Sequence, residues 1–315
     1  MSQLDLDSVE AVAKKDFQDA IRSRALLVLT TVFVVFFAAS AFFFADQVSQ
    51  QLDAVANSSN ASQAQAAQQI REGLTSDAFL DALTQVTRLL IPLTGIVVAY
   101  AALVGERESG TLKLLLALPH SRLDVVLGKV AGRSAVVAAP VLLGFLVAAP
   151  VFPILGVTFN AVNFALFALA TAFIGVVFVA LSVGVSAAAP TSRRAVITVV
   201  GLYALFTLLW GQFANAIVRE VSNNTDLGNT ALVKVFLVVK HLNPVATYQS
   251  LVASLGQGEL AARVSLVGGL QGQFIAQQLG EVPIYLTDGA LVVYLLLWIA
   301  VPVVLGYLTF QRADL

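Results

Sequence analysis

The sequence predicts an all-α membrane protein with six transmembrane helices, an N-terminal amphipathic helix and a large external loop between spans 5 and 6. Composition is the first reason: 58% of the 315 residues are hydrophobic and only 12% are charged, whereas soluble domains carry about 25% charged residues. The mean hydropathy is +0.85. The second reason is six apolar stretches close to the length, about 20 residues, that a helix needs to cross a bilayer. None of these stretches contains Asp, Glu, Lys, Arg or His.

The expected spans lie at about residues 25–45, 89–104, 134–155, 162–189, 195–218 and 290–310, in a single transmembrane domain that covers residues 1–315. The second stretch is short, so its helix is expected to begin earlier, with Arg88 extending to the interface. The first contains Ala39-Ser40-Ala41, which resembles a signal-peptide cleavage site. Its apolar run of about 20 residues exceeds the roughly 7–15 of a signal peptide. We therefore expect this span to remain as an anchor.

The distribution of Lys and Arg predicts the orientation, because these residues are enriched in cytoplasmic segments. With the N-terminus inside, 12 of the 18 Lys and Arg residues fall in inside segments. We therefore expect a multi-pass protein of the plasma membrane with both termini in the cytoplasm. In this orientation residues 46–85 and 219–288 are external, and residues 105–133 are cytoplasmic.

The segment before the first span has apolar residues at helical spacing with charged residues between them. These apolar residues are Leu6, Val9, Val12, Ala13, Phe17, Ala20 and Ile21. The pattern predicts an amphipathic helix on the inner membrane surface, with Lys15, Arg22 and Arg24 near lipid headgroups. The alternative is a solvated helix whose basic residues only satisfy the positive-inside rule.

The two external segments differ in composition. Residues 46–85 are rich in Ala, Gln and Ser, which is typical of a helical hairpin or a partly disordered cap. Residues 231–255 are strongly apolar but carry Lys234, Lys240 and His241, and Asn243-Pro244 interrupts them. A Lys at the centre of a span costs about 2.5 to 3.5 kcal/mol. We therefore expect an interfacial or re-entrant helix there, with a seventh span as the alternative.

Several classes of function are disfavoured by composition. The net charge of −1 gives no basic field for nucleic acid. The chain has no Cys, which excludes disulfides and zinc-thiolate sites. Methionine occurs only at position 1 and histidine only at positions 120 and 241, so few soft-metal ligands are present. We predict no catalytic, cofactor-binding or metal-binding residues in this chain.

Residues 105–129 concentrate charge between two expected spans. Glu106, Arg107 and Glu108 precede a short apolar run at residues 112–118, and further charged residues follow it. A run of this length cannot cross a bilayer, so it must pack on the inner face of the bundle or against another protein. A loop that only satisfies the positive-inside rule would not need the two acidic residues.

This stretch contains a pattern that lies between the second and third of the six expected spans. Its residues are Glu106, Arg107, Glu108, Ser109, Gly110, Thr111 and Leu112, then Leu115, Leu116, Pro119, Ser121, Arg122, Gly128 and Lys129. The pattern resembles the cytoplasmic signature of type 2 ABC transporter permeases, and most closely the subgroup of copper-enzyme-maturation permeases. The resemblance implies a membrane-spanning permease subunit of an ATP-driven exporter. It also implies that this subunit pairs with a second permease copy and with separate ABC ATPase subunits in trans.

The resemblance also assigns the coupling role to a set of residues in this segment. They are Glu106, Arg107, Glu108, Gly110, Thr111, Leu112, Leu115, Leu116, Pro119, Ser121 and Arg122. In this interpretation the three charged residues contact the ATPase while residues 112–118 dock in a groove on its surface. Residues 190–194, after the fourth span, are a candidate minor contact.

The sequence agrees with a subunit that lacks its own motor. No Gly-x-x-x-x-Gly-Lys-Ser/Thr motif occurs in it, so ATP and Mg²⁺ are expected in the partner subunit. Bare copper is a doubtful substrate because soft ligands are scarce. A lipid, a peptide, a sulfur species or a drug-like amphiphile fits equally well.

Two functions other than an ATP-driven permease remain open: an ion-coupled secondary carrier and a scaffold that anchors an ATPase. An ion-coupled secondary carrier usually has ionisable groups inside its spans, and the expected spans have none. A membrane-embedded hydrolase needs catalytic groups at membrane depth, and these are also lacking. A scaffold that anchors an ATPase without transporting anything differs from a permease only in whether a substrate crosses.

Overall fold

A computed structural model of the chain describes residues 5–56, 76–117, 121–265, 275 and 279–312. Within these residues six helical segments are long and apolar enough to cross a membrane, as the sequence predicts. They span Arg24–Gln50, Ser76–Glu108, Arg122–Ile154, Ala161–Ala188, Ser192–Asn224 and Asp288–Gln311. The all-α membrane fold is therefore confirmed.

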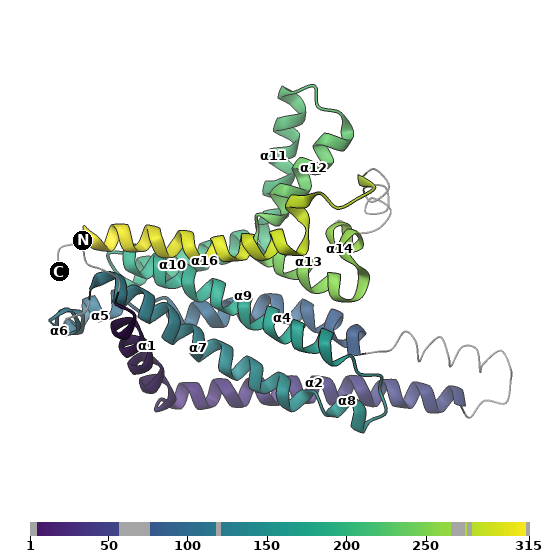
Figure 1. Cartoon of the computed structure of the whole chain (residues 1–315), viewed down its shortest axis with the longest axis horizontal. Helices are drawn as coiled ribbons and strands as arrows, with labels where there is room; N and C mark the ends of the chain where they lie inside the picture. The colour runs from purple at the N-terminus through teal and green to yellow at the C-terminus, as the bar shows by residue number, and fades with distance from the viewer. Residues whose placement is uncertain (1–4, 57–75, 118–120, 266–274, 276–278, 313–315) are drawn as a thin grey trace.

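Most of these spans are longer than the apolar runs in the sequence. The spans are built from several α-helices. They are α2 (Arg24–Ala56), α4 (Ser76–Ala99), α5 (Val104–Glu108), α7 (Arg122–Ala148), α8 (Val151–Ile154), α9 (Ala161–Ala188), α10 (Ser192–Ala204), α11 (Trp210–Asn224) and α16 (Asp288–Gln311). A π-helical turn, η1 (Leu205–Leu209), joins α10 to α11. In Figure 1 the bundle helices run side by side, whereas α11 and the following α12 stand away from the bundle.

Helix α9 is the centre of the bundle and packs against α4, α7 and α16. Glycine at the crossings lets the backbones approach closely. A Cβ on Gly184 would lie 2.2 Å from the carbonyl oxygen of Pro302, and one on Gly306 would lie 2.4 Å from the carbonyl oxygen of Gly184. Larger residues at these positions would force α9 and α16 apart.

The N-terminal helix α1 (Leu6–Ile21) begins at the N-cap Asp5 and packs along α7. Ser8, Val12 and Asp16 form its buried face, whereas Leu6 and Ile21 are exposed. The amphipathic helix is thus present, and one of its faces is bound to the bundle. The sequence pattern pointed only to the membrane surface.

Small residues on α7 make room for α1. A Cβ on Gly128 would lie 2.6 Å from the Cβ of Val12, and one on Gly132 would lie 2.9 Å from the carbonyl oxygen of Ala13. The two glycines are four residues apart and therefore share one face of α7. They allow the backbone of α1 to pack closely against this face of α7.

The opposite end of the bundle carries four further elements from the long segment between spans 5 and 6. They are α12 (Asn229–His241), α13 (Pro244–Gln257), α14 (Glu259–Ser265) and the 3₁₀ turn η2 (Ile284–Leu286). Asn243 caps α13 and Pro244 is its first residue, so the chain breaks where the sequence indicated. Helix α13 packs against α4, α9 and α16, and the hydroxyl of its Tyr248 lies 2.9 Å from both Thr87 Oγ1 and Thr171 Oγ1.

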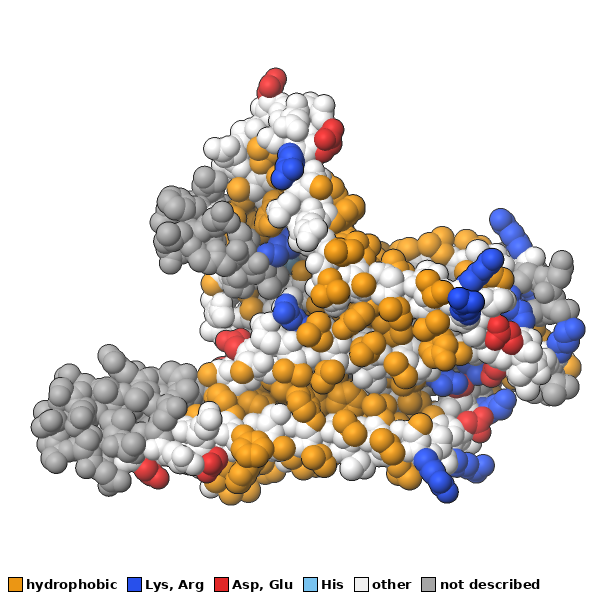
Figure 2. Space-filling view, turned by 180° about the vertical axis from the view of Figure 1, so that it is seen from behind, with side chains coloured by type: hydrophobic (Ala, Val, Ile, Leu, Met, Phe, Trp, Pro, Cys, Tyr) orange, Lys and Arg blue, Asp and Glu red, His pale blue; other side chains and the backbone are white. Residues whose placement is uncertain are grey.

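The surface has an apolar band between charged ends. Figure 2 shows hydrophobic side chains over the flank of the bundle, while Lys and Arg gather at the end that carries α1 and α5. The exposed apolar side chains include Val28 and Val35 on α2 and Val97 on α4. Such a band would be unstable in water and is matched to the hydrocarbon core of a bilayer.

Candidate functional site

Two short helices form an elbow at the end of the bundle that carries α1. Helix α5 ends at Glu108, and α6 (Thr111–Leu116) begins after Gly110. Gly110 has φ of +77°, a left-handed conformation that a side chain would strain. We call residues 104–117 the elbow. It lies in the segment that the sequence predicts to be cytoplasmic and to carry the coupling residues.

The elbow is anchored to α9 at its start. The backbone N–H groups of Leu103 and Val104 both donate to Ser186 Oγ at 3.1 Å. Val104 also packs against Ala189 and Ala195, on either side of the α9–α10 turn. Because all these groups are buried, the start of the elbow cannot move without the end of α9.

Glu106 belongs to a group of four charged residues that we call the charge cluster: Asp16, Glu106, Lys129 and Arg133. Lys129 Nζ lies 2.7 Å from Asp16 Oδ1 and 2.5 Å from Glu106 Oε1. Arg133 Nε lies 2.7 Å from Asp16 Oδ2. The cluster has two acids and two bases, so its charges balance, and it joins α1, α5 and α7.

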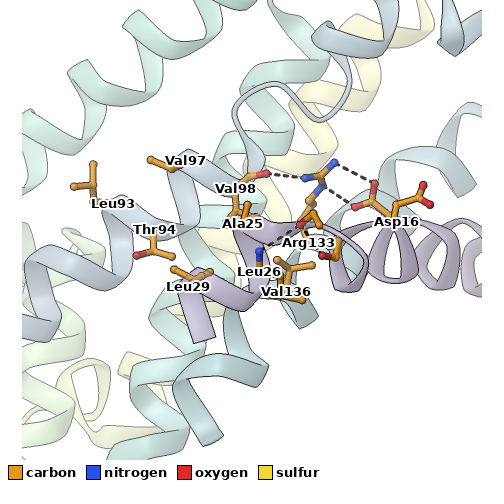
Figure 3. Close-up of a pocket in the computed structure, with 13 residues that line it drawn as sticks. Asp16, Ala25, Leu26, Leu29, Leu93, Thr94, Val97, Val98, Arg133 and Val136 are labelled. Atoms are coloured by element: carbon orange, nitrogen blue, oxygen red, sulfur yellow. Dashed lines mark hydrogen bonds and ion pairs between the residues drawn. The ribbon is translucent and has the colours of Figure 1, made fainter. Parts of the chain in front are cut away.

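Burial makes the charge cluster sensitive to the loss of any member. The side chains of Lys129 and Asp16 are only 4% and 6% exposed, and that of Glu106 is 25% exposed. A buried ion pair adds little net stability, but removing one partner leaves a charge that neither water nor protein neutralises. In Figure 3 the guanidinium of Arg133 also reaches the carbonyl oxygen of Val98 on α4, at 3.1 Å.

The other two charged residues of the elbow contact the turn between α9 and α10. Arg107 Nη2 donates to the carbonyl oxygen of Ala189. Glu108 accepts hydrogen bonds from the backbone N–H of Ser192 at 2.9 Å and from its hydroxyl at 2.5 Å. A carboxylate at a helix N-terminus is favoured by the free N–H groups there. The elbow therefore holds the start of the fifth span.

Helix α6 turns Leu112 and Leu115 inward. Leu112 and Leu115 are 1% and 7% exposed, and both pack with core residues of α4, α7 and α9. Leu116 is half-buried, whereas Thr111 and Lys113 are exposed. The expected docking of the apolar run into an ATPase groove thus cannot involve Leu112 and Leu115 in this conformation. The nearest apolar surface for them is the bundle itself.

The remaining predicted coupling residues lie at the start of α7. Ser121 and Asp124 form a capping box, with Ser121 N donating to Asp124 Oδ2 at 2.9 Å. Arg122 Nη1 donates to the carbonyl oxygens of Phe310 and Gln311 at 2.5 and 2.9 Å. These carbonyls lie at the C-terminal end of α16, where a cationic side chain is favoured. Pro119 lies outside the described residues.

A cavity of about 540 Å³ lies beside the charge cluster, between α1, α2, α4 and α7. Figure 3 shows Asp16 and Arg133 at one side and Leu26, Leu29 and Leu93 along the other. The lining is therefore charged toward α1 and apolar along the spans. Such a cavity suits an amphiphilic molecule with its polar end toward α1.

The sequence interpretation missed three members of this site: Asp16, Lys129 and Arg133. It treated Asp16 as part of a polar face and Lys129 only as part of the family pattern. A signal was present, because Gly128 and Gly132 are spaced like Lys129 and Arg133, four residues apart. Two small residues beside two bases on one helix predict a close and acidic partner.

Comparison with known proteins agrees with this architecture. Residues 10–315 match the family model described as ABC-2 family transporter protein. A probable ABC transporter permease protein NosY of Stutzerimonas stutzeri is 28% identical over 316 residues, which cover 98% of this chain and 99% of the relative. A protein with the same name from Pseudomonas aeruginosa is 30% identical over 207 residues, or 64% of this chain and 68% of the relative.

These matches confirm the resemblance that the sequence pattern carried, including its subgroup. The family model covers nearly the whole chain, from α1 to the end of α16, and so includes the elbow and every span. The chain belongs to the ABC-2 family of transporter proteins and is a multi-pass membrane protein of the ABC transporter permease type.

Proposed function

We propose that this chain is the membrane-spanning subunit of an ATP-driven exporter and is moved by a separate ATPase that binds the elbow. The observation that carries the proposal is the elbow's geometry. Its tip at Thr111 and Lys113 is exposed. Glu106 is paired with Lys129 on α7, which also holds Asp16 on α1, and the other two charged residues are bonded to the turn between α9 and α10. A partner at the tip would therefore act on four helices at once.

The proposed mechanism uses two sets of contacts. Glu106 links the elbow to Lys129 and, through Asp16, to α1. Arg107 and Glu108 link it to the α9–α10 turn. When ATP closes the ATPase pair, displacement of α6 would pull on the ends of the second, third, fourth and fifth spans together. The charged residues act inside the permease, and the exposed tip meets the ATPase.

The proposal includes an orientation and an assembly. The α1 end, where Lys and Arg gather (Figure 2), is cytoplasmic, with both termini there. Two permease copies pair with two ATPase subunits, as the family resemblance implies, and ATP and Mg²⁺ are held by the ATPase. A substrate with amphiphilic character fits the cavity between α1, α2, α4 and α7.

The test is a mild-detergent purification of the tagged chain from its own membranes, followed by an ATPase assay on what co-purifies. The variant Lys113→Glu reverses an exposed charge at the elbow tip, and Lys15→Glu makes the same change on the exposed side of α1. We expect wild type and Lys15→Glu to co-purify with an ATPase. Lys113→Glu should recover about tenfold less ATPase activity, which corresponds to a loss of about 1.4 kcal/mol in binding free energy.

Failure to recover any nucleotide-binding chain in several detergents would overturn the proposal. The protein would then be an ion-coupled carrier, because a scaffold that anchors an ATPase would also recover one. Equal recovery with Lys113→Glu and Lys15→Glu would reject the elbow tip as the binding surface while leaving the ATPase partnership in place.

A further inference from the structure

A second cavity lies at the end of the bundle remote from α1, where η1, α11, α12 and α13 meet. Its volume is about 310 Å³, near the lower limit of about 300 Å³ for small-molecule sites. Phe206, Trp210 and Phe236 give it aromatic walls, and Lys240 and Asn243 are its polar members near α13. This cavity is separate from the elbow and from the cavity beside the charge cluster.

Lys240 is the side chain that distinguishes this cavity. It is half-buried, and no described carboxylate forms an ion pair with it. Its Nζ lies 5.5 Å from the centre of the Phe236 ring, so a ring face is its neighbour where an anion would be expected. Burial lowers the pKa of Lys240 to about 8. A partly buried ammonium without an anionic partner is stabilised by any anion that binds beside it.

Three of the other polar side chains around the cavity already have partners. Asn243 Nδ2 donates to the carbonyl oxygen of Phe206 at 2.7 Å. Trp210 Nε1 donates to the carbonyl oxygen of Val239 at 3.1 Å, and Thr207 Oγ1 donates to the carbonyl oxygen of Tyr203 at 2.7 Å. These bonds fix the walls. The remaining polar residue of the lining, Asn215, is neutral, so the ammonium of Lys240 is the charged group in the lining that can recognise an anion.

The backbone also departs from regular geometry here. Phe206 and Thr207 belong to the π-helical turn η1. Such turns are rare and occur often at functional sites, because the extra residue leaves a gap in the regular helix packing. In this chain the π-helical turn faces the same cavity as Lys240.

We infer that this cavity binds an organic anion, with its charged group on the ammonium of Lys240 and its apolar body against Phe206, Trp210 and Phe236. The same chemistry is offered by a small soluble carboxylate and by the head of an anionic lipid. A neutral molecule of the same shape would lack the ion pair, and a cation would be repelled. The site does not depend on the ATPase partnership proposed above.

Tryptophan fluorescence can test the site directly, because the chain has two Trp residues and one of them lines the cavity. The variant Trp298→Phe leaves Trp210 as the sole reporter, and the wild-type chain is titrated in parallel. The soluble probe is 3-iodobenzoate, whose iodine quenches an indole in contact with it. The matched neutral probe is 3-iodobenzamide. For the lipid source, the full chain is placed in nanodiscs with brominated phosphatidylglycerol or brominated phosphatidylcholine.

Lys240→Gln and Lys240→Arg are the informative variants, and Lys234→Gln is the control because Lys234 is exposed on the same helix. We expect 3-iodobenzoate to quench Trp210 saturably, with Kd weakened about tenfold or more by Lys240→Gln and little changed by Lys240→Arg or Lys234→Gln. Lys240→Gln removes an unpaired cation, so its melting temperature without ligand should not fall. A purely structural lysine would instead lower it.

The two sources give different patterns, and both support the site. A soluble ligand predicts quenching by 3-iodobenzoate, and a lipid ligand predicts stronger quenching by brominated phosphatidylglycerol than by brominated phosphatidylcholine. Equal quenching by 3-iodobenzoate and 3-iodobenzamide, with no preference between the two lipids, would overturn the inference. So would identical affinity in Lys240→Gln and Lys234→Gln.

Discussion

The Nζ of Lys129 lies 2.7 Å from Oδ1 of Asp16, a residue 113 positions earlier in the chain. This pair attaches the N-terminal helix to the third span, and Glu106 on the elbow completes it from the other side. Helix α1, whose sequence pattern is typical of a membrane-surface helix, is thereby connected to the elbow. The elbow is the segment that we propose receives force from an ATPase. The predictions below test this arrangement.

Replacing Asp16 by Asn should destabilise the protein by about 3 kcal/mol, because a buried lysine and a nearby arginine lose their shared carboxylate. Thermal unfolding of the purified chain measures the effect, and limited proteolysis should show earlier cleavage in α1. Asp19→Asn is the matched control, since Asp19 is exposed on the same helix. Equal effects of the two variants would contradict a structural role for the charge cluster.

Gly132→Ala should also loosen α1, for a steric reason. The new Cβ would lie 2.9 Å from the carbonyl oxygen of Ala13 and 3.0 Å from the Cβ of Asp16, and overpacking of this kind costs about 1 to 3 kcal/mol. At Gly201, in α10, a Cβ would meet nothing within 4 Å, so Gly201→Ala should be neutral or stabilising by about 0.5 kcal/mol. Opposite signs of the two shifts in melting temperature are the expected result.

Glu108→Ala should free the start of α10 without unfolding the bundle. The variant removes both hydrogen bonds to Ser192, which cap the free N–H groups at the start of α10. Because both bonds to the start of α10 are lost, hydrogen exchange should rise at residues 190–195 and stay unchanged at the centre of α9. Ser109→Ala, at an exposed neighbour, serves as the control. Unchanged exchange in Glu108→Ala would show that the elbow does not hold this turn.

Acid should destabilise the end of the bundle remote from α1 through His241. Burial lowers the pKa of His241 from 6.5 to about 4, and the ring is fully buried between Leu237 and Ser250, with Arg263 and Lys240 as cationic neighbours. The unfolded chain takes up the proton below about pH 6.5, whereas the folded chain takes it up only near pH 4. Stability is therefore complete above pH 6.5 and falls by about 3 kcal/mol as the pH drops to 4.

The measurement is thermal unfolding between pH 7 and 4 for wild type and for His241→Gln, which cannot titrate. The difference in slope between the two isolates the histidine from the carboxylates, which contribute to both. Parallel curves would mean that the pKa of His241 is the same in the folded and unfolded chain, which would contradict the account.

The sequence was sufficient for the spans because their signal is local. Each span contains a continuous apolar run, and the break before α13 follows from Asn243 and Pro244, which cap and begin that helix. The turn at Gly110 was also visible in the family pattern. These features depend on residues close together in the chain, so composition and spacing reveal them.

The contacts of the elbow could not be predicted in this way. Glu106 and Glu108 looked available to a partner, because periodicity does not show that their own partners are Lys129 and Ser192. Leu112 and Leu115 looked available for docking, but the core of the bundle buries them. Each case is a tertiary contact between segments distant in sequence. Local patterns give the polarity of such residues and not the group they meet.

The central claim, that the elbow tip meets an ATPase, can be tested with a single introduced thiol, because the chain has no Cys. Thr111→Cys and Lys113→Cys place it at the exposed tip, and Ser222→Cys places it on exposed α11 at the opposite end. The account predicts that a short thiol-reactive crosslinker, applied to native membranes, joins the first two variants to a nucleotide-binding chain and leaves the third unlinked. Crosslinking from position 222 with none from 111 or 113 would contradict it.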